Sequence, residues 1–258
     1  MKFVIGNLKM NISSAQERDR YFESFKKEVK NIKTEPDTQI VLCVPSLFLE
    51  TFSKKIKSKG ISIGVQNIFW EEKGSFTGET SPLSAANLGA QYAIIGHSER
   101  RRYFNETSEQ ANLKIKAALK NKLTPVYCVG ETKEEREEGT AAESIISQIR
   151  RGMEELTPGQ AEKVIIAYEP VWAVGSDLVP TSDEILEVKI LLKKILVEKY
   201  GLAVAEKVSI LYGGSVKAES INQLCLEPGL DGVLVGRESL MPRDFLKIVS
   251  VMESDNKK

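Results

Sequence analysis

Short, mainly apolar segments recur along the whole chain, and most of them read as runs rather than as an alternation of apolar and polar residues. Runs of this length are typical of strands that are buried on both faces, as in a parallel sheet covered by helices. We therefore predict about eight strands of one parallel sheet. The predicted strands are Phe3–Ile5, Ile40–Val44, Ile61–Val65, Tyr92–Ile95, Pro125–Val129, Val164–Ala167, Val208–Leu211 and Gly232–Val235.

Helical stretches lie between these runs, and several begin with a capping box, in which a hydroxyl and a carboxylate three residues later bind backbone amides. The stretch after Thr181 spaces its apolar residues three and four positions apart, and Gly201 follows its end. The chain is thus predicted to repeat a unit of strand, loop and helix. The predicted capping boxes are Ser14/Glu17, Thr132/Glu135, Thr140/Glu143 and Thr181/Glu184.

This repeat predicts an α/β fold, namely a single-domain (β/α)8 barrel with a parallel eight-stranded barrel formed by residues 1–258. The competing architecture is an open doubly wound sheet. Such a sheet usually carries a GxGxxG turn after its first strand, and none occurs there. No linker or low-complexity tract interrupts the chain, so we expect one domain.

Composition and charge narrow the class of function. The chain has 36 Lys and Arg against 36 Asp and Glu, and this neutral balance argues against nucleic-acid or anionic-membrane partners. No apolar run approaches the roughly 18 residues that span a bilayer, and no signal peptide is evident, so we expect a cytoplasmic protein. Cys43, Cys128 and Cys225 are scattered among apolar residues, which favours buried free thiols over disulfides or a metal site.

The stretch from Val164 to Gly175 ends an apolar run on a lone carboxylate, Glu169, which Pro170 follows at once. A glutamate at the end of a buried strand is held by rigid backbone, and Pro170 fixes φ where a mobile lid would begin. The functional interpretation is a catalytic base beneath a lid. Considered alone, Glu169 is equally well explained as a solvated residue at a strand end.

Other polar residues stand where predicted strands end, the place where barrels of this kind carry their active sites. His97 is the only histidine, and the Ser-Glu-Arg after it can begin a helix, whose N-terminus would keep the imidazole neutral. Lys9 lies two residues past Asn7 on the same face and suits an anionic substrate. Glycines after the seventh and eighth predicted strands match a phosphate cup made of backbone N–H groups.

Together these residues form motifs that resemble those of the triosephosphate isomerase family, in order and over essentially the whole chain. The two most specific motifs contain His97 and Glu169. The motifs are Asn7-x-Lys9-Met10-Asn11, Ile95-Gly96-His97-Ser98-Glu99-Arg100-Arg101, Cys128-x-Gly130-Glu131, Ala167-Tyr168-Glu169-Pro170-Val171-Trp172-Ala173-x-Gly175, Tyr212-Gly213-Gly214-Ser215-Val216 and Leu234-Val235-Gly236.

The resemblance implies an enzyme that interconverts dihydroxyacetone phosphate and D-glyceraldehyde 3-phosphate through an enediol(ate), in glycolysis and gluconeogenesis, without a metal or cofactor. It implies that Glu169 shuttles the proton between C1 and C2 and that neutral His97 hydrogen-bonds the carbonyl oxygens. Lys9 and Asn7 would orient the substrate, and Glu99 would support the site. The implied substrate- and phosphate-binding residues are Asn7, Lys9, Gly175, Ser176, Gly213, Gly214, Ser215, Gly236 and Arg237, with residues 170–181 as the lid.

The long loop Gln66–Pro82 contains Phe69, Trp70 and Phe76 and could pack on itself as an Ω-loop. The resemblance implies instead that this loop inserts into a second copy of the chain, where Thr77 reaches the active site. We therefore expect a homodimer that acts on a small phosphorylated triose, with no nucleic-acid or membrane partner.

Three positions depart from the family pattern. Leu8 replaces a common tryptophan, Asp177 stands in the lid where glycine is usual, and Arg237 stands where a glycine usually lines the phosphate. We predict that Asp177 and Arg237 form an ion pair when the lid closes. The alternative is that Arg237 pairs with Glu238 or points to solvent.

Two other functions stay open at this point. A Schiff-base aldolase would use a strand-borne lysine, but Lys9 precedes a site with its own base, and no second lysine stands at the other strand ends named above. The other candidate is an inactive phosphate-binding barrel, and the presence of Glu169, His97 and Lys9 argues against it.

Overall fold

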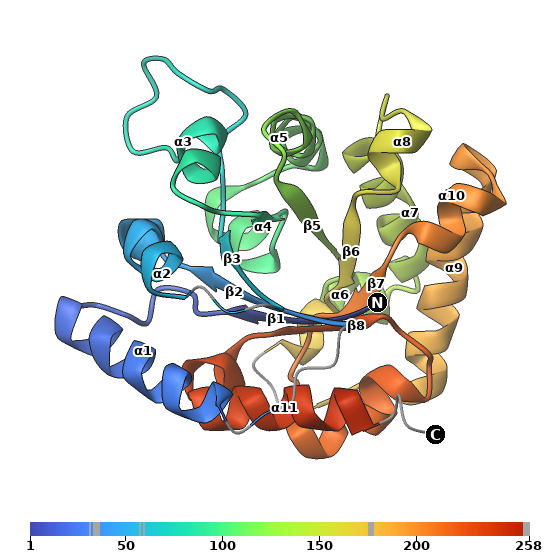
Figure 1. Ribbon diagram of the computed structural model, residues 1–258. Helices are drawn as coiled ribbons and strands as arrows, with labels where there is room; N and C mark the ends of the chain where they lie inside the picture. Colours follow the sequence, from blue (N-terminus) through green and yellow to red (C-terminus); the bar gives the residue numbers. More distant parts are fainter. Residues whose placement is uncertain (31, 33–36, 57, 59, 175–177, 255–258) are drawn as a thin grey trace.

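The computed structural model describes residues 1–30, 32, 37–56, 58, 60–174 and 178–254. Its strands close into a barrel of eight, with every neighbouring pair parallel and β8 paired with β1 (Figure 1). This confirms the predicted parallel barrel. The strands are β1 (Lys2–Asn7), β2 (Thr38–Val44), β3 (Ile61–Val65), β4 (Tyr92–Ile95), β5 (Thr124–Val129), β6 (Ile165–Tyr168), β7 (Ile210–Tyr212) and β8 (Gly232–Val235).

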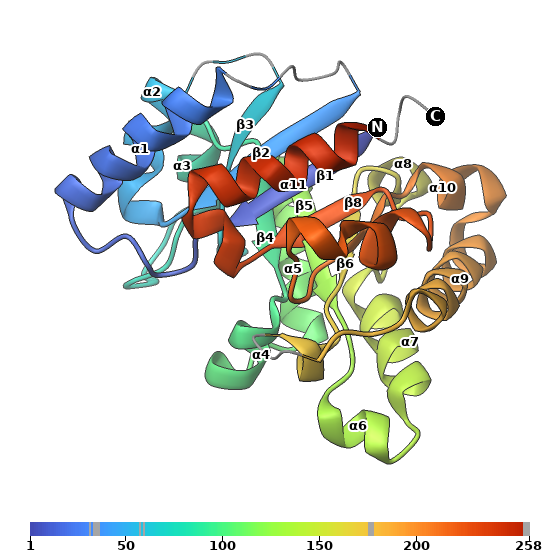
Figure 2. The ribbon, with the colours of Figure 1, turned by 90° about the horizontal axis from the view of Figure 1, so that it is seen from below.

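Helices surround the barrel and cover the outward faces of its strands, with α1 and α11 packed against each other (Figures 1 and 2). The helices are α1 (Ala15–Val29), α2 (Leu49–Lys55), α3 (Pro82–Asn87), α4 (Ser98–Phe104), α5 (Ser108–Lys120), α6 (Lys133–Glu137), α7 (Ala141–Gly152), α8 (Pro158–Ala161), α9 (Ser182–Tyr200), α10 (Leu202–Lys207) and α11 (Pro242–Ser254). Short turns of helix precede α2 and follow β6, β7 and β8: η1 (Ser46–Phe48), η2 (Val171–Ala173), η3 (Ala218–Ser220), η4 (Asn222–Leu226) and η5 (Arg237–Leu240).

The predicted capping boxes have mixed outcomes. The Ser14 hydroxyl accepts from the N–H of Glu17, but the Glu17 carboxylate binds Ser13 instead of completing the box. The prediction at Thr140 is wrong, because its hydroxyl donates to the carbonyl oxygen of Glu135 near the end of α6. The boxes that form as predicted are Thr132/Glu135 and Thr181/Glu184.

Side chains alternate between the barrel interior and the helices along each strand, as the pleat of a strand requires. On β6, Ile165 and Ala167 belong to the interior cluster, whereas Ile166 and Tyr168 pack with the helices. Glu169 is the next inward position in this alternation. The end of β6 therefore places its carboxylate at the C-terminal rim of the barrel interior.

Glycines make room for Glu169 on the neighbouring strand ends. A Cβ on Gly130, after β5, would lie 1.9 Å from the carbonyl oxygen of Glu169. A Cβ on Gly213, after β7, would lie 2.8 Å from its Cγ. Atoms essentially never pack this closely, so both positions require glycine for Glu169 to keep its place.

The loop between β3 and α3 projects from the barrel (Figure 1). Its aromatic residues pack on one another, with the ring centroid of Phe69 4.0 Å from that of Trp70 and 4.6 Å from that of Phe76. Thr77 follows this cluster and is exposed to solvent. The loop thus has the self-packed aromatic cluster of the Ω-loop alternative while still presenting Thr77 outward.

Candidate active site

The carboxylate of Glu169 is buried, with only 2% of the residue exposed, and both of its oxygens have a neighbour. Oε2 accepts a hydrogen bond from the backbone N–H of Ser98 at 3.0 Å, and Oε1 lies 3.2 Å from Nε2 of His97. Ser98 is the first residue of α4, where backbone N–H groups have no partner within the helix. The start of α4 therefore supplies a donor that fixes the position of the Glu169 carboxylate.

His97 caps α4 with its own side chain. Its Nδ1 accepts a hydrogen bond from the N–H of Glu99 at 3.2 Å. A ring nitrogen that accepts a hydrogen bond carries no proton, so in the neutral ring the proton is on Nε2, which faces Glu169. The geometry suits a neutral imidazole that donates from Nε2.

Lys9 is held in a strained backbone conformation, with φ of 48°. Such a conformation costs a residue other than glycine about 1–3 kcal/mol and persists where the surroundings fix it. Asn7 Oδ1 accepts from the N–H of Lys9 at 3.0 Å, and Gln66 Nε2 donates to its carbonyl oxygen at 2.9 Å. Its ammonium binds Glu99 Oε1 at 2.6 Å. The structure therefore brings Asn7, Lys9 and Glu99 together as a side-chain cluster.

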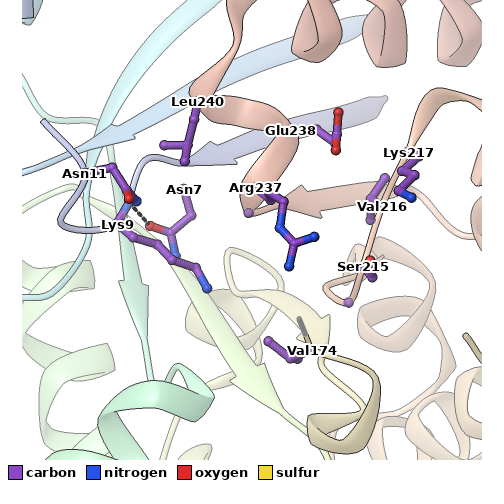
Figure 3. Close-up of a pocket in the computed structure, with 12 residues that line it drawn as sticks. Asn7, Lys9, Asn11, Val174, Ser215, Val216, Lys217, Arg237, Glu238 and Leu240 are labelled. Atoms are coloured by element: carbon purple, nitrogen blue, oxygen red, sulfur yellow. Dashed lines mark hydrogen bonds between the residues drawn. The ribbon is translucent and has the colours of Figure 1, made fainter. Parts of the chain in front are cut away.

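Beside this cluster the loops after β1, β7 and β8 enclose a cavity of about 230 Å³ (Figure 3). Buried Ser239 ties two of these loops together, since its hydroxyl lies 2.6 Å from the carbonyl oxygen of Gly236 and 3.0 Å from that of Asn7. The residues that line the cavity are Asn7, Lys9, Asn11, Val174, Gly214, Ser215, Val216, Lys217, Gly236, Arg237, Glu238 and Leu240.

Only some of the residues that were expected to bind phosphate line this cavity. Gly214, Ser215, Gly236 and Arg237 line the cavity. Gly213 does not line it and lies instead against the side chain of Glu169. Gly175, Ser176 and Asp177, all expected on the lid, lie outside the described residues.

The first turn of the expected lid, η2, is attached to the loop after β5 through Glu131. Oε1 of Glu131 accepts from Nε1 of Trp172 at 2.6 Å and from the hydroxyl of Tyr168 at 3.1 Å, and its backbone carbonyl accepts from the N–H of Val171. Burial raises the pKa of Glu131 above its ordinary value. Sequence reasoning gave Glu131 no role, although a glutamate inside the quoted Cys128 motif was a signal.

A buried ion-pair network fixes the turn that carries His97. Glu106 Oε1 accepts from the N–H of Gly96 at 2.9 Å, and its Oε2 binds Lys114 Nζ at 2.6 Å and Arg100 Nε at 2.5 Å. Lys114 also donates to Asn67 Oδ1 at the base of the β3–α3 loop, at 2.8 Å. Sequence reasoning missed this network. The available signal was a lysine on the apolar face of α5, which needs a buried partner.

Other features of the described ranges bear on metal binding and membrane insertion. Within these ranges, no group of three or more His, Cys, Asp and Glu residues is placed to hold a metal ion. No helix in the same ranges is long and apolar enough to cross a membrane. The cysteine prediction is confirmed, since Cys43, Cys128 and Cys225 are free and buried.

Comparison with known proteins gives a consistent result. The model of the triosephosphate isomerase family matches residues 2–252. A triosephosphate isomerase of Clostridium perfringens is 44% identical over 247 residues, which are 96% of this chain and 98% of that protein. One of Dictyoglomus thermophilum is 43% identical over 249 residues, with the same coverage of both chains. One of Lactobacillus delbrueckii subsp. bulgaricus is 40% identical over 251 residues, 97% of this chain and 98% of that protein.

Proposed function

The chain belongs to the triosephosphate isomerase family, and from this premise we propose that Glu169, His97 and Lys9 carry out its reaction. It is an isomerase that interconverts dihydroxyacetone phosphate and D-glyceraldehyde 3-phosphate, a reaction of glycolysis. The observation that supports the assignment of residues is the 3.2 Å approach of His97 Nε2 to the Glu169 carboxylate, at the inner rim of the barrel.

In the proposed mechanism Glu169 removes a proton from C1 of dihydroxyacetone phosphate, and the electrons of that C–H bond form the C1–C2 double bond. Negative charge then develops on the oxygen at C2, where the Nε2–H of His97 donates a hydrogen bond. A proton passes from the hydroxyl at C1 to the oxygen at C2. Glu169 then returns its proton to carbon C2, the electrons of the double bond form the new C2–H bond, and the carbonyl forms at C1. A base above the carbon next to a carbonyl and a donor at the developing oxyanion suffice for this chemistry.

Glu169 must change partners to act in this way, because Ser98 and His97 now bind its two oxygens. We propose that substrate binding draws the carboxylate away from Ser98 and toward C1. The Ser98 N–H thus holds the carboxylate in place until the substrate arrives.

Lys9 is proposed to act at both ends of the substrate, the phosphate group and the reacting carbons. Its Nζ lies 2.6 Å from Glu99 on one side, and a Cβ added to Gly236 in the phosphate cavity would lie 3.8 Å from Nζ on the other. An ammonium at this position offsets the negative charge of both the phosphate and the enediolate. Asn7, which holds the Lys9 backbone, is proposed to orient the substrate with it.

The proposal is tested by measuring turnover of dihydroxyacetone phosphate and glyceraldehyde 3-phosphate with the purified chain in a coupled assay. We expect isomerisation in both directions. An absence of turnover would favour the inactive phosphate-binding barrel. A lysine that becomes trapped by borohydride in the presence of substrate would favour the Schiff-base aldolase.

We also propose that the chain forms a homodimer through the β3–α3 loop. A second cavity, of about 610 Å³, lies on the other side of Lys9 and is lined by His97, Glu99 and Tyr103 among others. Exposed apolar side chains surround it, since Met10 is 94% exposed and Tyr103 65%. An exposed patch of this kind is typical of a protein interface, and the projecting loop of a second copy is its proposed occupant.

Placing arginine at Thr77 tests the dimer. We expect the dimer dissociation constant to rise about tenfold or more, because an unpaired guanidinium in an interface is unfavourable even when its long stem reaches toward the rim. Analytical ultracentrifugation over a range of concentrations measures this, with isomerase activity followed in parallel. Thr140→Arg is the control, since Thr140 is exposed before α7. A Thr77→Arg protein that keeps the wild-type dissociation constant would contradict the proposed docking.

Two further proposals concern the domain organisation of the protein and its cellular compartment. We propose that residues 1–258 form one domain, because the first and last strands pair to close a single barrel. We also propose that it acts in the cytoplasm, where glycolysis takes place.

A further inference from the structure

Strand β5 continues past the end of its neighbour β4. The two strands last pair at Ile95 and Tyr127, and at Gly96, whose φ is 72°, the chain leaves β4 and turns into α4. On its other side β5 stays paired with β6, since the carbonyl oxygen of Val129 accepts from the N–H of Glu169 at 2.7 Å. The edge of β5 that β4 has left therefore needs other partners for its backbone N–H and C=O groups.

Gly130, directly after β5, faces this edge. Successive residues of a parallel strand direct their backbone groups to opposite neighbours. The residue before Gly130 bonds to Glu169, and the carbonyl oxygen of the residue after it, Glu131, accepts from the N–H of Val171 at 3.0 Å. The N–H and C=O of Gly130 itself therefore point away from β6, to the side that β4 has left.

Gln148, on α7, binds both of these groups with its side-chain amide. Its Oε1 accepts from the N–H of Gly130 at 2.9 Å, and its Nε2 donates to the carbonyl oxygen of Gly130, also at 2.9 Å. Nε2 donates as well to Ser144 Oγ at 3.2 Å, and the Tyr127 hydroxyl donates to the backbone carbonyl oxygen of Gln148 at 2.7 Å. A side-chain amide has the donor and the acceptor of a peptide group, so Gln148 takes the place of one residue of a neighbouring strand.

We propose that Gln148 is a positioning residue for the isomerisation and acts through Gly130 on Glu169. This deepens the proposed function and rests on it. Gly130 lies against the main chain of Glu169, since a Cβ added to Gly130 would lie 1.9 Å from the Glu169 carbonyl oxygen. The two bonds from Gln148, here called the amide clamp, thus hold in place the backbone that carries the proposed base and leads into η2.

Loss of the amide clamp is expected to affect turnover more than substrate binding. Lys9 and Asn7, which are proposed to bind the substrate, lie at the end of β1, and β1 is on the opposite side of the barrel from β5. Gln148 acts instead on the strand ends around Glu169. A catalytic group misplaced by about 1 Å can lower the rate about 10²-fold. A smaller displacement of Glu169 should therefore lower kcat and leave KM nearly unchanged.

The test compares Gln148→Met with wild type by steady-state kinetics and by hydrogen exchange. Methionine has nearly the same length, but it has no N–H group to donate and only a weak acceptor. We expect kcat to fall about tenfold, with KM within about threefold of wild type. The N–H of Gly130 should exchange with deuterium at least about tenfold faster, because its partner has been removed.

Gln148→Glu is a second variant that keeps the shape of the side chain. Its carboxylate can accept from the N–H of Gly130 but cannot donate to the carbonyl oxygen. We expect kcat to fall at least about fivefold, again with little change in KM. Circular dichroism and urea unfolding show whether both variants are folded under the conditions of the assay.

Gln160→Met is the matched control. Gln160 also binds a backbone group with its side chain, since its Oε1 accepts from the N–H of Thr157 at 2.9 Å. It lies on α8, which precedes β6, whereas Glu169 follows the end of that strand. Gln160→Met should lower the urea concentration at the midpoint of unfolding without changing kcat.

Three results would overturn the proposal. They are a kcat of Gln148→Met within about twofold of wild type, equal falls in kcat from Gln148→Met and Gln160→Met, and unchanged exchange of the Gly130 N–H in Gln148→Met. Hydrogen exchange needs no turnover. A wild-type protein without isomerase activity would therefore count against the proposed function, and exchange at Gly130 would still test the amide clamp.

Discussion

Replacing Glu169 by glutamine is expected to lower kcat by about 10²–10⁴-fold, the range associated with general acid–base catalysis. Glutamine has the same shape, so it fits between Gly130 and Gly213, and its carbonyl oxygen can still accept from the N–H of Ser98. Its amide cannot take a proton from C1. The loss should therefore appear in kcat, with the fold retained, and steady-state kinetics with circular dichroism measures both.

The control for this variant lies at the other end of the same strand. Glu162 ends α8 just before β6 and pairs with Lys207 on the surface. Glu162→Gln removes an equal charge from the protein without touching the site, and kcat should stay at the wild-type value. A Glu169→Gln enzyme within about tenfold of wild type would contradict the assignment of Glu169 as the base.

The position of Glu169 illustrates what the sequence predicts well. An unbroken apolar run marks β6, and a strand buried on both faces must place every second residue inside the barrel. The strand starts were less accurate. Val164 and Val208 were predicted in strands because they are apolar and buried, but their N–H groups bond back to Ala161 and Val204 in the preceding turn or helix. Burial alone does not distinguish a strand from the turn that leads into it.

Site residues could be predicted from the sequence where a polar residue stands at the end of a predicted strand. His97, Lys9 and Glu169 were found in this way, together with the family resemblance. Gly213 was expected at the phosphate but lies against Glu169, because a glycine can serve a ligand or a neighbouring side chain and the sequence does not distinguish them. Glu106 was missed, since its partners Gly96 and Lys114 come from other elements and no local pattern connects the three.

Replacing Glu106 by glutamine is expected to lower the free energy of unfolding by about 3–5 kcal/mol, the usual effect of removing one partner from a buried ion pair. Glu106 is 5% exposed and Lys114 3%, so the ammonium would be left unpaired away from water. Glutamine keeps the volume of the side chain, which excludes a cavity as the cause. Urea unfolding at fixed protein concentration measures the loss.

The loss should also depend on pH. Burial alone would raise the pKa of Glu106, but Lys114 and Arg100 outweigh it and hold that pKa below its ordinary value of 4.5. Burial lowers the pKa of Lys114, and Glu106 offsets part of that effect. A carboxyl group with a lowered pKa contributes stability above its unfolded pKa, and the contribution is lost as the pH falls through its folded pKa. The difference between wild type and Glu106→Gln should therefore be largest near neutral pH and shrink below about pH 4.5.

Helix α5 also provides the control for burial. Glu109 lies three residues from Glu106 and binds Arg151 at 2.7 Å, but both of these side chains are more than half exposed. Glu109→Gln should cost at most about 1 kcal/mol, as exposed pairs do. Adding Lys114→Met to Glu106→Gln should recover part of the loss, because it removes the ammonium that the first change leaves unpaired. If Glu106→Gln and Glu109→Gln lowered the free energy of unfolding equally, the buried Glu106 network would stabilise the protein no more than an exposed ion pair does. That result would contradict the prediction.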